Sequence, residues 1–337
     1  MSKNITLTGI TPSGTPHLGN YIGAIKPAIA SVSEQGSDLS FYFLSDYHSL
    51  VKCHDPATVH QSTFEVAATW LAFGLDPEKV IFYRQSDVPE IMELAWILAC
   101  SAPKGLLNRA HAYKAEVDKN LQKEADPDKG ITMGLFCYPV LMAADILMFH
   151  ANRVPVGKDQ IQHIEIARDI AGYFNHKYGK LFTPPEAMID DDAETLLGLD
   201  GRKMSKSYNN VLPVFAPEKK LRKLVMKIKT NSLMPGEPKD HTDCILFSIY
   251  RSFATAAEVE TMKEAYANGI AWGEAKQIVF ECLNMHLTPY REKYEALIAD
   301  GAYLEKVLLE GAEKARSYAT PFLNEVRHAV GLRSLVK

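Results

Sequence analysis

Two short stretches of this sequence combine glycine, hydroxyl and basic residues in a way that suits phosphate binding. The first is a turn rich in glycine and proline, which runs from Gly9 to Asn20 and precedes a helical pattern that begins at about Asn20. Backbone N–H groups in such a turn, together with the N-terminus of the following helix, can hold anionic phosphates. The turn therefore predicts a nucleotide site, although a turn with a purely structural role can have the same composition.

The spacing within this turn excludes two common kinds of nucleotide site. Gly14 and Gly19 are separated by four residues, as in a P-loop, but Asn20 and Tyr21 stand where a P-loop requires lysine followed by serine or threonine. The sequence also lacks the Gly-x-Gly-x-x-Gly pattern of dinucleotide-binding folds. We therefore expect neither a kinase-like NTPase nor a dinucleotide-dependent enzyme.

The second stretch runs from Asp200 to Asn210 and concentrates positive charge. Three basic residues and two hydroxyls fall within six positions, namely Arg202, Lys203, Ser205, Lys206 and Ser207. A loop of this kind can close on a polyphosphate and stabilise the negative charge that develops when the polyphosphate is cleaved. A solvated loop without a ligand would show the same charge, so only the pairing of Lys203–Ser207 with the first stretch favours the functional interpretation.

Both stretches need a scaffold, and the N-terminal part of the chain alternates between β-rich runs and helical patterns. The expected strands are near-continuously apolar or β-branched, as in a sheet covered on both faces, and they are Ile5–Thr8, Leu39–Leu44, Val80–Arg84 and Arg153–Val156. One helix is expected to start after the N-cap Asp55 and to end at Phe73, with Gly74 at the C′ position, and another to open near Asp159. Residues 1–212 are thus predicted to form a doubly wound (Rossmann-like) α/β domain with a parallel sheet.

The C-terminal part of the chain has a different pattern. No convincing strand appears between Pro217 and Lys337, and Trp272–Ala299 carries apolar residues at helical spacing. We expect residues 213–337 to form an all-helical second domain, whose last helices can pack back on the first. A polar, turn-rich bridge that begins at Asp190–Asp192 connects the two.

The overall composition narrows the class of protein. The 337 residues are 47% hydrophobic and 23% charged, which suits two globular domains, and no apolar stretch is long enough to span a membrane. The net charge of −4 argues against non-specific coating of nucleic acid but permits a local basic surface. Five cysteines without a Cys-x-x-Cys pair predict reduced, mostly buried thiols and no zinc site, and the start of the chain, which has no apolar signal segment, predicts a cytoplasmic protein.

The two phosphate-binding candidates together resemble a known family. His17-Leu-Gly-Asn20 and Lys203-Met-Ser-Lys-Ser207 are similar to the HIGH and KMSKS signatures of the class I aminoacyl-tRNA synthetases. The resemblance implies that His17, Asn20, Lys203 and Lys206 stabilise the α-phosphate of ATP, with Mg²⁺ on the phosphates, while an amino acid carboxylate displaces pyrophosphate. The ATP-binding residues that it implies are Thr11, Pro12, Ser13, His17, Gly19, Asn20, Gly157, Lys158, Asp159, Lys203, Met204, Ser205, Lys206 and Ser207.

The segments Tyr138–Leu147 and Val154–Asp169 resemble bacterial tryptophanyl-tRNA synthetases in particular. Tyrosyl-tRNA synthetases share the Asp159-Gln160 pair but not the whole combination. The resemblance implies that tryptophan is bound by Leu7, His48, Tyr138, Met142, Asp145 and Gln160. Two positions depart from the family, because Thr11 and Tyr47 stand where glutamine is frequent, so contacts made by a longer amide are in doubt there.

The position of Asp145 supplies a physical argument for tryptophan. The residue lies between Ala144 and Ile146 on an apolar helix, so we expect its carboxylate to be partly desolvated and to need a hydrogen-bond donor. The indole N–H is a donor only, and a site built on that bond rejects phenylalanine because the carboxylate would be left unpaired. The same carboxylate can instead cap or bridge structural elements, and that alternative stays open.

The resemblance also implies partners for the second domain. It implies that the helical domain reads the anticodon of tRNA(Trp) and that the protein is a homodimer bridged by tRNA. Six basic residues in eleven positions, which are Lys219, Lys220, Arg222, Lys223, Lys227 and Lys229, can contact RNA phosphates or form a solvated helix face. Alternatives to a tryptophan–tRNA ligase are a tyrosine-specific ligase and a catalytically silent paralogue that binds tryptophan or RNA.

Overall fold

A single parallel sheet forms the centre of the N-terminal part of the protein. The computed structural model describes residues 3–34, 39–157, 160–189 and 196–335, and the bridge residues Asp190–Asp192 lie outside these ranges. The strands are β1 (Ile5–Ile10), β2 (Leu39–Leu44), β3 (Ile81–Arg84), β4 (Arg153–Val156) and β5 (Glu186–Ile189). All neighbouring pairs are parallel, in the order β3-β2-β1-β4-β5. The predicted doubly wound α/β fold is therefore confirmed.

The sequence prediction missed one strand and misplaced one helix start. β5 has four residues, directly after Pro184-Pro185, and it lies at the edge of the sheet, where a strand is covered too little to show a continuous apolar run. The first helix begins at Leu18 rather than at about Asn20, because the imidazole of His17 serves as its N-cap. Histidine is not among the residues that usually mark a helix start, so the sequence rules placed it too late.

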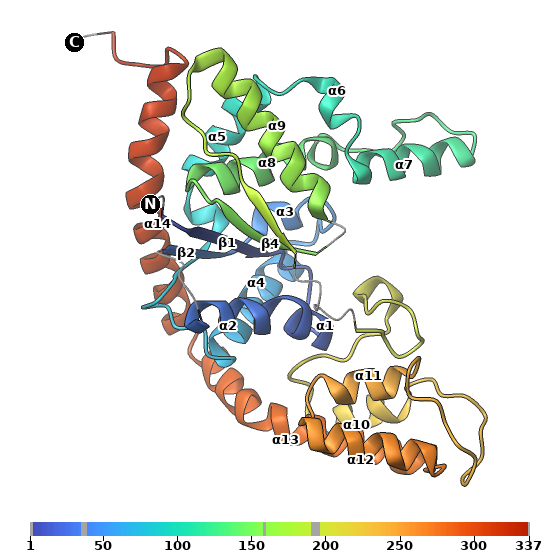
Figure 1. Cartoon of the computed structure of the whole chain (residues 1–337). Coiled ribbons are helices and arrows are strands. Elements are labelled where there is room, and N and C mark those ends of the chain that lie inside the picture. The colour runs from blue at the N-terminus through green and yellow to red at the C-terminus, as the bar shows by residue number, and fades with distance from the viewer. Residues whose placement is uncertain (1–2, 35–38, 158–159, 190–195, 336–337) are drawn as a thin grey trace.

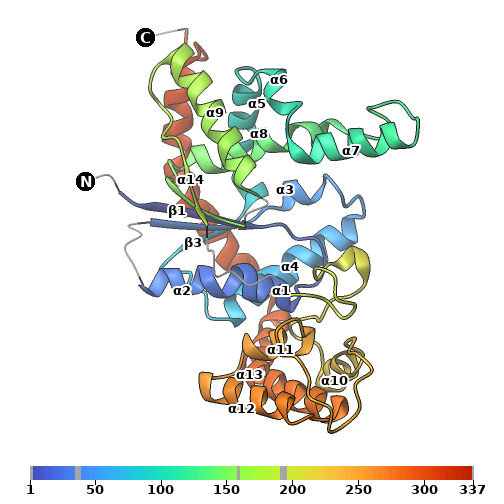
Figure 2. The same cartoon turned by 45° about the vertical axis from the view of Figure 1, so that its right-hand side comes forward.

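Helices cover both faces of the sheet, and Figures 1 and 2 show α2 and α4 on one side and α8 and α9 on the other. The helices of this part are α1 (Leu18–Asn20), η1 (Tyr21–Ile25, one turn of π-helix), α2 (Lys26–Glu34), α3 (Asp46–Ser49), α4 (Pro56–Ala72), η2 (Gln85–Asp87), α5 (Glu90–Ala99), α6 (Lys104–Leu107), α7 (His111–Gln122), α8 (Met133–Met148) and α9 (Ile161–Tyr178). The Asp55 side chain caps α4 as expected, and Gly74 follows its C-cap with a φ of +98°.

The strand β2 shows how one sheet serves two hydrophobic cores. Phe41 and Phe43 belong to the core that includes residues of α5, α8 and α9, whereas Tyr42 and Leu44 belong to the core on the α4 side. This alternation is the one that a strand buried on both faces must have, since successive side chains point to opposite faces. The second core continues without interruption into the helices that follow residue 217.

Every named element in the described part of residues 213–337 is a helix, as expected. After η4 (Lys206–Tyr208), which precedes this part, the helices are α10 (Glu218–Met226), α11 (Ile245–Arg251), α12 (Ala256–Ala267), α13 (Trp272–Ala299) and α14 (Gly301–Ala329). In Figure 1, α10–α12 lie together at one end of the molecule, and α14 runs back along the sheet. α14 packs so closely on β3 that a Cβ atom at Gly311 would lie 1.7 Å from the carbonyl oxygen of Phe82.

The cysteines differ from the sequence expectation in one respect. All five are free thiols, but only Cys282 is buried, and Cys100 on the surface side of α5 is exposed. The expectation of mostly buried thiols is therefore wrong, because spacing alone carries no information about burial. Across the described ranges, the helices include none with the length and apolar character needed to cross a bilayer.

Candidate active site

A cavity of about 690 Å³ opens at the carboxyl ends of β1 and β4. These strands are neighbours at the point where the winding of the sheet reverses, which is where doubly wound folds bind ligands. All six residues predicted to contact tryptophan line it, and they are Leu7, His48, Tyr138, Met142, Asp145 and Gln160. Thr11 and Ser13, from the glycine-rich turn, line it as well. Tyr47, the second position that departs from the family, is not among the described residues that line the cavity.

Asp145 is the buried acidic group of this cavity. Its side chain is 1% exposed, Oδ2 lies 2.9 Å from His48 Nε2, and Oδ1 accepts a hydrogen bond of 2.7 Å from the Gln85 side-chain amide. Burial raises the pKa of Asp145, and the bonds to His48 and Gln85 oppose that shift. The carboxylate is thus desolvated, as expected, and two protein side chains already contact its oxygens. Because a carboxylate has about four acceptor positions, it can still accept a further N–H.

Gln85 is a site residue that the sequence analysis missed. It is 0% exposed, and its Oε1 accepts a hydrogen bond of 3.2 Å from the backbone N–H of Tyr47. That bond turns the amide nitrogen toward Asp145, so the side chain has one orientation. A signal was present in the sequence, since polar residues that directly follow a buried strand lie at the sheet edge where ligands bind.

Aromatic and polar groups of α8 and α9 form another wall of this cavity. The Tyr138 hydroxyl lies 2.5 Å from Nε2 of His163, and burial raises the pKa of Tyr138. His163 also lines the cavity, and the sequence analysis assigned it no role. Gln160 is exposed at the N-cap of α9, where its N–H bonds to the Gly157 carbonyl at 2.9 Å. Lys158 and Asp159, predicted to contact ATP, lie outside the described residues.

The first phosphate-binding candidate forms a reciprocal cap. His17 Nδ1 accepts the N–H of Asn20 at 3.3 Å, and Asn20 Oδ1 accepts the N–H of His17 at 3.1 Å. Burial, followed by the charge of Lys206, lowers the pKa of His17 to about 4, so the imidazole is neutral near pH 7. With Nδ1 acting as the acceptor, the ring proton resides on Nε2, which can donate to a phosphate oxygen.

Backbone pairing brings the second candidate against the first. The N–H of Leu18 donates to the carbonyl of Leu212 at 2.9 Å, and the N–H of Val214 donates to the carbonyl of Pro16 at 3.0 Å. These bonds join segments almost 200 residues apart in the sequence. As a result, Lys206 Nζ donates to the carbonyl of Gly14 at 2.6 Å, and burial lowers the pKa of Lys206 to about 8.

Asn210 organises the second stretch and was not singled out from the sequence. Its buried amide nitrogen donates to Asp200 Oδ1 at 2.7 Å, and its Oδ1 accepts the N–H of Ser205 at 2.8 Å. Lys203 is exposed, whereas the Met204 side chain is 4% exposed in the second core, so only the main chain of Met204 can reach a ligand.

The remaining predicted ATP contacts have mixed environments. Pro12 is buried, and the side chain of Ser207 lies outside the described residues. Gly19 lies against the His17 ring, where an added Cβ would approach the ring atoms to 3.1 Å. A side chain at this position would therefore crowd the His17 ring that caps α1.

Comparison with known proteins places these features in context. The family model described as tRNA synthetases class I (W and Y) matches residues 2–288. The tryptophan–tRNA ligase of Pseudomonas aeruginosa is 58% identical, covering 98% of this chain and 74% of that protein, and the Neisseria meningitidis enzyme of the same name is 55% identical, covering 99% and 100%. A tryptophanyl-tRNA synthetase structure from Campylobacter jejuni, complexed with ADP and tryptophan, superposes with a TM-score of 0.87 at 41% identity, covering 97% of this chain and 99% of that chain.

Proposed function

The chain belongs to the class I tryptophanyl-tRNA synthetases, and we propose that its cavity around Asp145 binds tryptophan while the adjoining turn and Lys203–Ser207 bind ATP. The enzyme is a tryptophan–tRNA ligase: it converts tryptophan and ATP to tryptophanyl-adenylate and pyrophosphate, then transfers the tryptophanyl group to the 3′ end of tRNA(Trp). The observation that carries the site assignment is a buried carboxylate, Asp145, with donors on both oxygens, at the end of a partly apolar cavity.

In this proposal, Asp145 accepts the indole N–H and selects tryptophan. Leu7 and Met142 supply apolar contacts to the indole, and Tyr138 is positioned by His163. His48 and Gln160 lie on the side of the amino and carboxylate groups. A tyrosine hydroxyl can also donate to a carboxylate, but it projects further from the side chain than the indole N–H, so the depth of the cavity decides between the two amino acids.

Adenylation then depends on electrostatics and positioning. Lys206, Lys203 and the neutral His17 donate to the phosphates, and Asn20 holds the His17 ring, which stabilises charge as pyrophosphate departs. Among the described residues, no group of three His, Cys, Asp or Glu side chains is arranged to hold a metal ion. Mg²⁺ would therefore be held chiefly by the ATP phosphates and would neutralise part of their charge.

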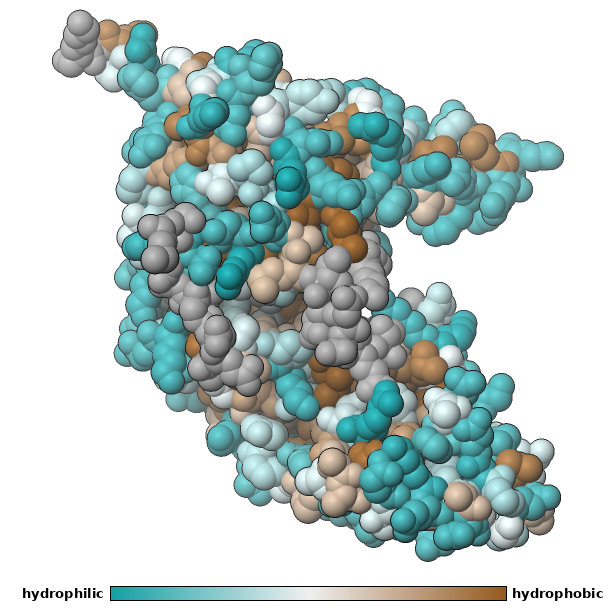
Figure 3. Space-filling model, viewed as in Figure 1, coloured by the Kyte–Doolittle hydropathy of each residue, from teal (hydrophilic) through white to brown (hydrophobic). Residues whose placement is uncertain are grey.

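A candidate surface for tRNA lies beside an opening of the molecule. Figure 3 shows a wide recess between the arm that carries α7 and the end that carries α10–α12. The α10 side of this end carries exposed basic side chains, namely Lys219, Lys220, Arg222, Lys223, Lys227 and Lys229. We propose that they contact tRNA phosphates, with anticodon reading by the helices of residues 213–337 and action in the cytoplasm, where tRNA and ATP are available.

A second copy of the chain is the other proposed partner. On α5, Met92 is 42% exposed, Trp96 is 72% exposed and Cys100 is exposed, and these residues lie at every fourth position on one face. Large exposed apolar groups aligned in this way are typical of an interface. We propose that this face forms the homodimer contact.

Tryptophan-dependent exchange of pyrophosphate into ATP tests the assignment. The exchange is expected with tryptophan and not with tyrosine, and Asp145→Ala is expected to lower kcat/KM for tryptophan far more than it raises KM for ATP. Absence of exchange in the purified protein, or an equal effect of Asp145→Ala on both substrates, would contradict the proposal. Exchange driven by tyrosine would instead support the tyrosine-specific alternative.

A further inference from the structure

A second cavity, of about 630 Å³, shares a wall with the tryptophan cavity. The shared wall is the segment from Ser45 to His54, which includes α3. Asp46, Leu50 and His54, at every fourth position, line the second cavity, while Ser45, His48 and Ser49 line the tryptophan cavity. Cys53 lines both cavities, so this helical turn and its extension form the partition between them.

The walls of the second cavity are largely apolar. α4 and α14 supply them, through Val59, Thr63, Phe64, Leu304 and Leu308. Leu304 and Leu308 are buried on α14, one turn apart. A concave apolar surface of this volume with a few polar groups has the general properties of a small-molecule site.

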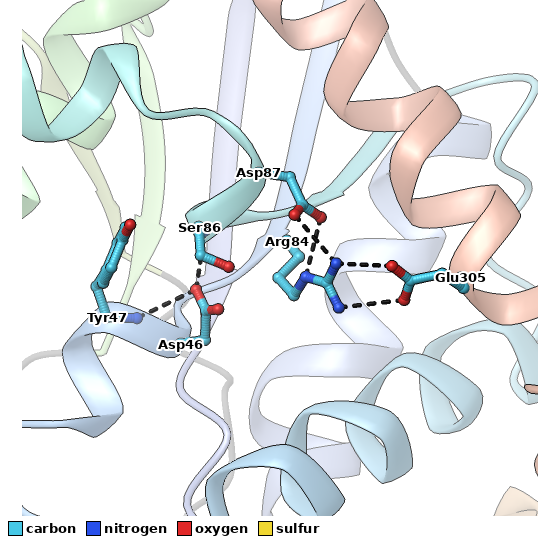
Figure 4. Close-up of polar contacts among 6 residues, drawn as sticks. All are labelled: Asp46, Tyr47, Arg84, Ser86, Asp87 and Glu305. Carbon is cyan, nitrogen blue, oxygen red and sulfur yellow. Dashed lines mark hydrogen bonds and ion pairs between the residues drawn. The ribbon is translucent and has the colours of Figure 1, made fainter. Parts of the chain in front are cut away.

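The carboxylates on and beside the cavity wall outnumber its single guanidinium, and Figure 4 shows their contacts. Arg84 donates four hydrogen bonds, at 2.9 and 3.0 Å to Asp87 and at 3.1 and 2.9 Å to Glu305. One guanidinium thus faces two carboxylates, and Asp46 adds a third charge, held by the N–H groups of Tyr47 at 3.1 Å and Ser86 at 3.0 Å. Among the described residues that line this cavity, Arg84 alone is a lysine or arginine.

Asp46 is the group that an incoming cation would stabilise. Burial raises its pKa, while bonds from Ser86, the charge of Arg84 and the N–H of Tyr47 oppose the shift. A primary ammonium group is compact, carries three donors and can bond to Asp46, while Glu305 adds a second carboxylate to the lining of the cavity. His54 and His60 also line the cavity, and both side chains are exposed. The apolar walls remain available to the rest of the ligand.

We propose that the second cavity binds a small molecule with an apolar body and a primary ammonium group, and that its occupancy alters tryptophan binding. The second half of this statement rests on the proposed function of the first cavity. The connection between the cavities is short, because the backbone N–H of Tyr47 is shared between Asp46 Oδ1 at 3.1 Å and Gln85 Oε1 at 3.2 Å. Gln85 in turn bonds to Asp145.

A change at Asp46 thus reaches the tryptophan carboxylate through one N–H and one amide side chain. If an ammonium group draws Asp46 toward the second cavity, the Tyr47 N–H shifts between its two acceptors, and the position of Gln85 changes with it. Ser86, whose N–H holds Asp46, is also the next residue after Gln85. We therefore expect occupancy to change KM for tryptophan more than KM for ATP.

Binding is tested with cyclohexylamine and its uncharged analogue cyclohexanol, titrated into the full chain by NMR while tryptophan saturates the first cavity. Cyclohexylamine is expected to bind with a dissociation constant on the order of millimolar, as suits its size, and at least about tenfold more tightly than cyclohexanol. Equal binding of the two, or no binding of the amine, would overturn the site.

Two adjacent leucines on α14 supply a matched pair of variants. Leu308 is 4% exposed and lines the cavity, whereas Leu309 is 44% exposed and does not. Leu308→Trp should fill the cavity and abolish amine binding, and Leu309→Trp should leave it unchanged. If Leu308→Trp does not fold, Glu305→Gln should weaken amine binding several-fold relative to Glu310→Gln. Undiminished binding in a folded Leu308→Trp protein or in Glu305→Gln would contradict the site.

Regulation is measured separately in the exchange assay. Cyclohexylamine is expected to change KM for tryptophan several-fold in the Leu309→Trp enzyme and not in the Leu308→Trp enzyme. Binding of the amine without a change in KM would overturn the coupling between the cavities. Failure of tryptophan-dependent exchange without amine would overturn the proposed function, and the binding titration would still decide whether the second site exists.

Discussion

Asp145 can select an N–H donor only while its buried carboxylate remains an acceptor, and two neighbouring side chains keep it so. Burial raises its pKa, which favours the protonated form, whereas His48 and Gln85 direct donors at its two oxygens. Gln85 is fixed from the other side by the Tyr47 N–H. In the proposed site, selectivity therefore depends on a residue that need not touch tryptophan, and we regard Gln85 as a positioning residue.

Replacement of this amide should affect one substrate selectively. Gln85→Ala is expected to lower kcat/KM for tryptophan by about 5- to 150-fold, because a buried carboxylate that loses a donor costs about 1–3 kcal/mol. KM for ATP should change little. Steady-state exchange kinetics measure both, with Gln61→Ala as the control, since Gln61 is exposed on α4 and is not among the residues that line the cavity. Similar losses in both variants, or for both substrates, would contradict the role of Gln85.

The lowered pKa of Lys206 leads us to expect that kcat/KM for ATP depends on pH. Burial lowers its pKa to about 8, against the opposing charge of Glu65, so Lys206 loses its proton as the pH rises through about 8. The neutral amine stabilises phosphate charge poorly, and kcat/KM reports the free enzyme. We expect kcat/KM for ATP to fall above about pH 8 in the wild type. Lys206→Arg keeps its charge to much higher pH, and an unchanged fall near pH 8 in that variant would refute the assignment.

At the scale of elements, the contact between α14 and β3 joins the C-terminal helix to the sheet. The absence of a side chain at Gly311 lets the helix backbone approach the Phe82 carbonyl, and Arg84 at the end of the same strand binds Glu305 of α14. The last helix is therefore part of the layer that covers the sheet, although it follows the helices α10–α13 in sequence. Its position also supplies one wall of the second cavity.

Substitutions at two glycines within helices can separate the effect of this close packing from the general preference of helices for alanine over glycine. Gly311→Ala should lower the free energy of unfolding by about 1–3 kcal/mol, because the added methyl group meets backbone atoms that cannot move independently. Gly172→Ala, in α9 with open space around it, should raise the free energy by about 0.5–1 kcal/mol. Urea unfolding measures both. A Gly311→Ala protein as stable as the wild type would show that α14 is not held so closely.

The whole molecule presents an apolar face and an open recess, and we propose a partner for each. Trp96 and Met92 remain exposed on a helix whose other face is buried in the core. Figure 3 shows the recess beside the α10–α12 end. Neither feature stabilises an isolated chain, because exposed apolar area gives no hydrophobic stabilisation until it is covered. In our proposal, assembly with a second copy and with tRNA supplies that cover.

A charge in the centre of the α5 face should separate the proposed dimer. Trp96→Glu is expected to yield a folded monomer in sedimentation velocity, since the interface would lose its largest apolar side chain and gain a buried charge. Met285→Glu, at an exposed apolar position of α13, should leave the dimer intact. A monomeric wild type, or a Trp96→Glu protein that remains dimeric, would contradict this interface.

Local patterns in the sequence determined the element order, the α/β class, the helical C-terminal part and the family. The strands β2 and β4, the cap of α4 and the range of α13 agree with their predicted bounds, because each depends on residues within one or two turns of the chain. The family resemblance also named six residues that prove to share one cavity. In contrast, β5 and the start of α1 were misjudged, because an edge position and a histidine cap have weak local signals.

Only the tertiary structure decided which residues that are far apart in the sequence contact each other. Gln85 meets Asp145 across 60 positions, and Lys206 meets the Gly14 carbonyl across 192. No periodicity reports such pairs, since they depend on which strand ends become neighbours and which loops pair through their backbones. The same holds for the second cavity, whose walls come from α3, α4 and α14. The sequence by itself determined which chemical groups the protein carries, and the packing of its elements decided which of them face each other, at what distance and with what pKa.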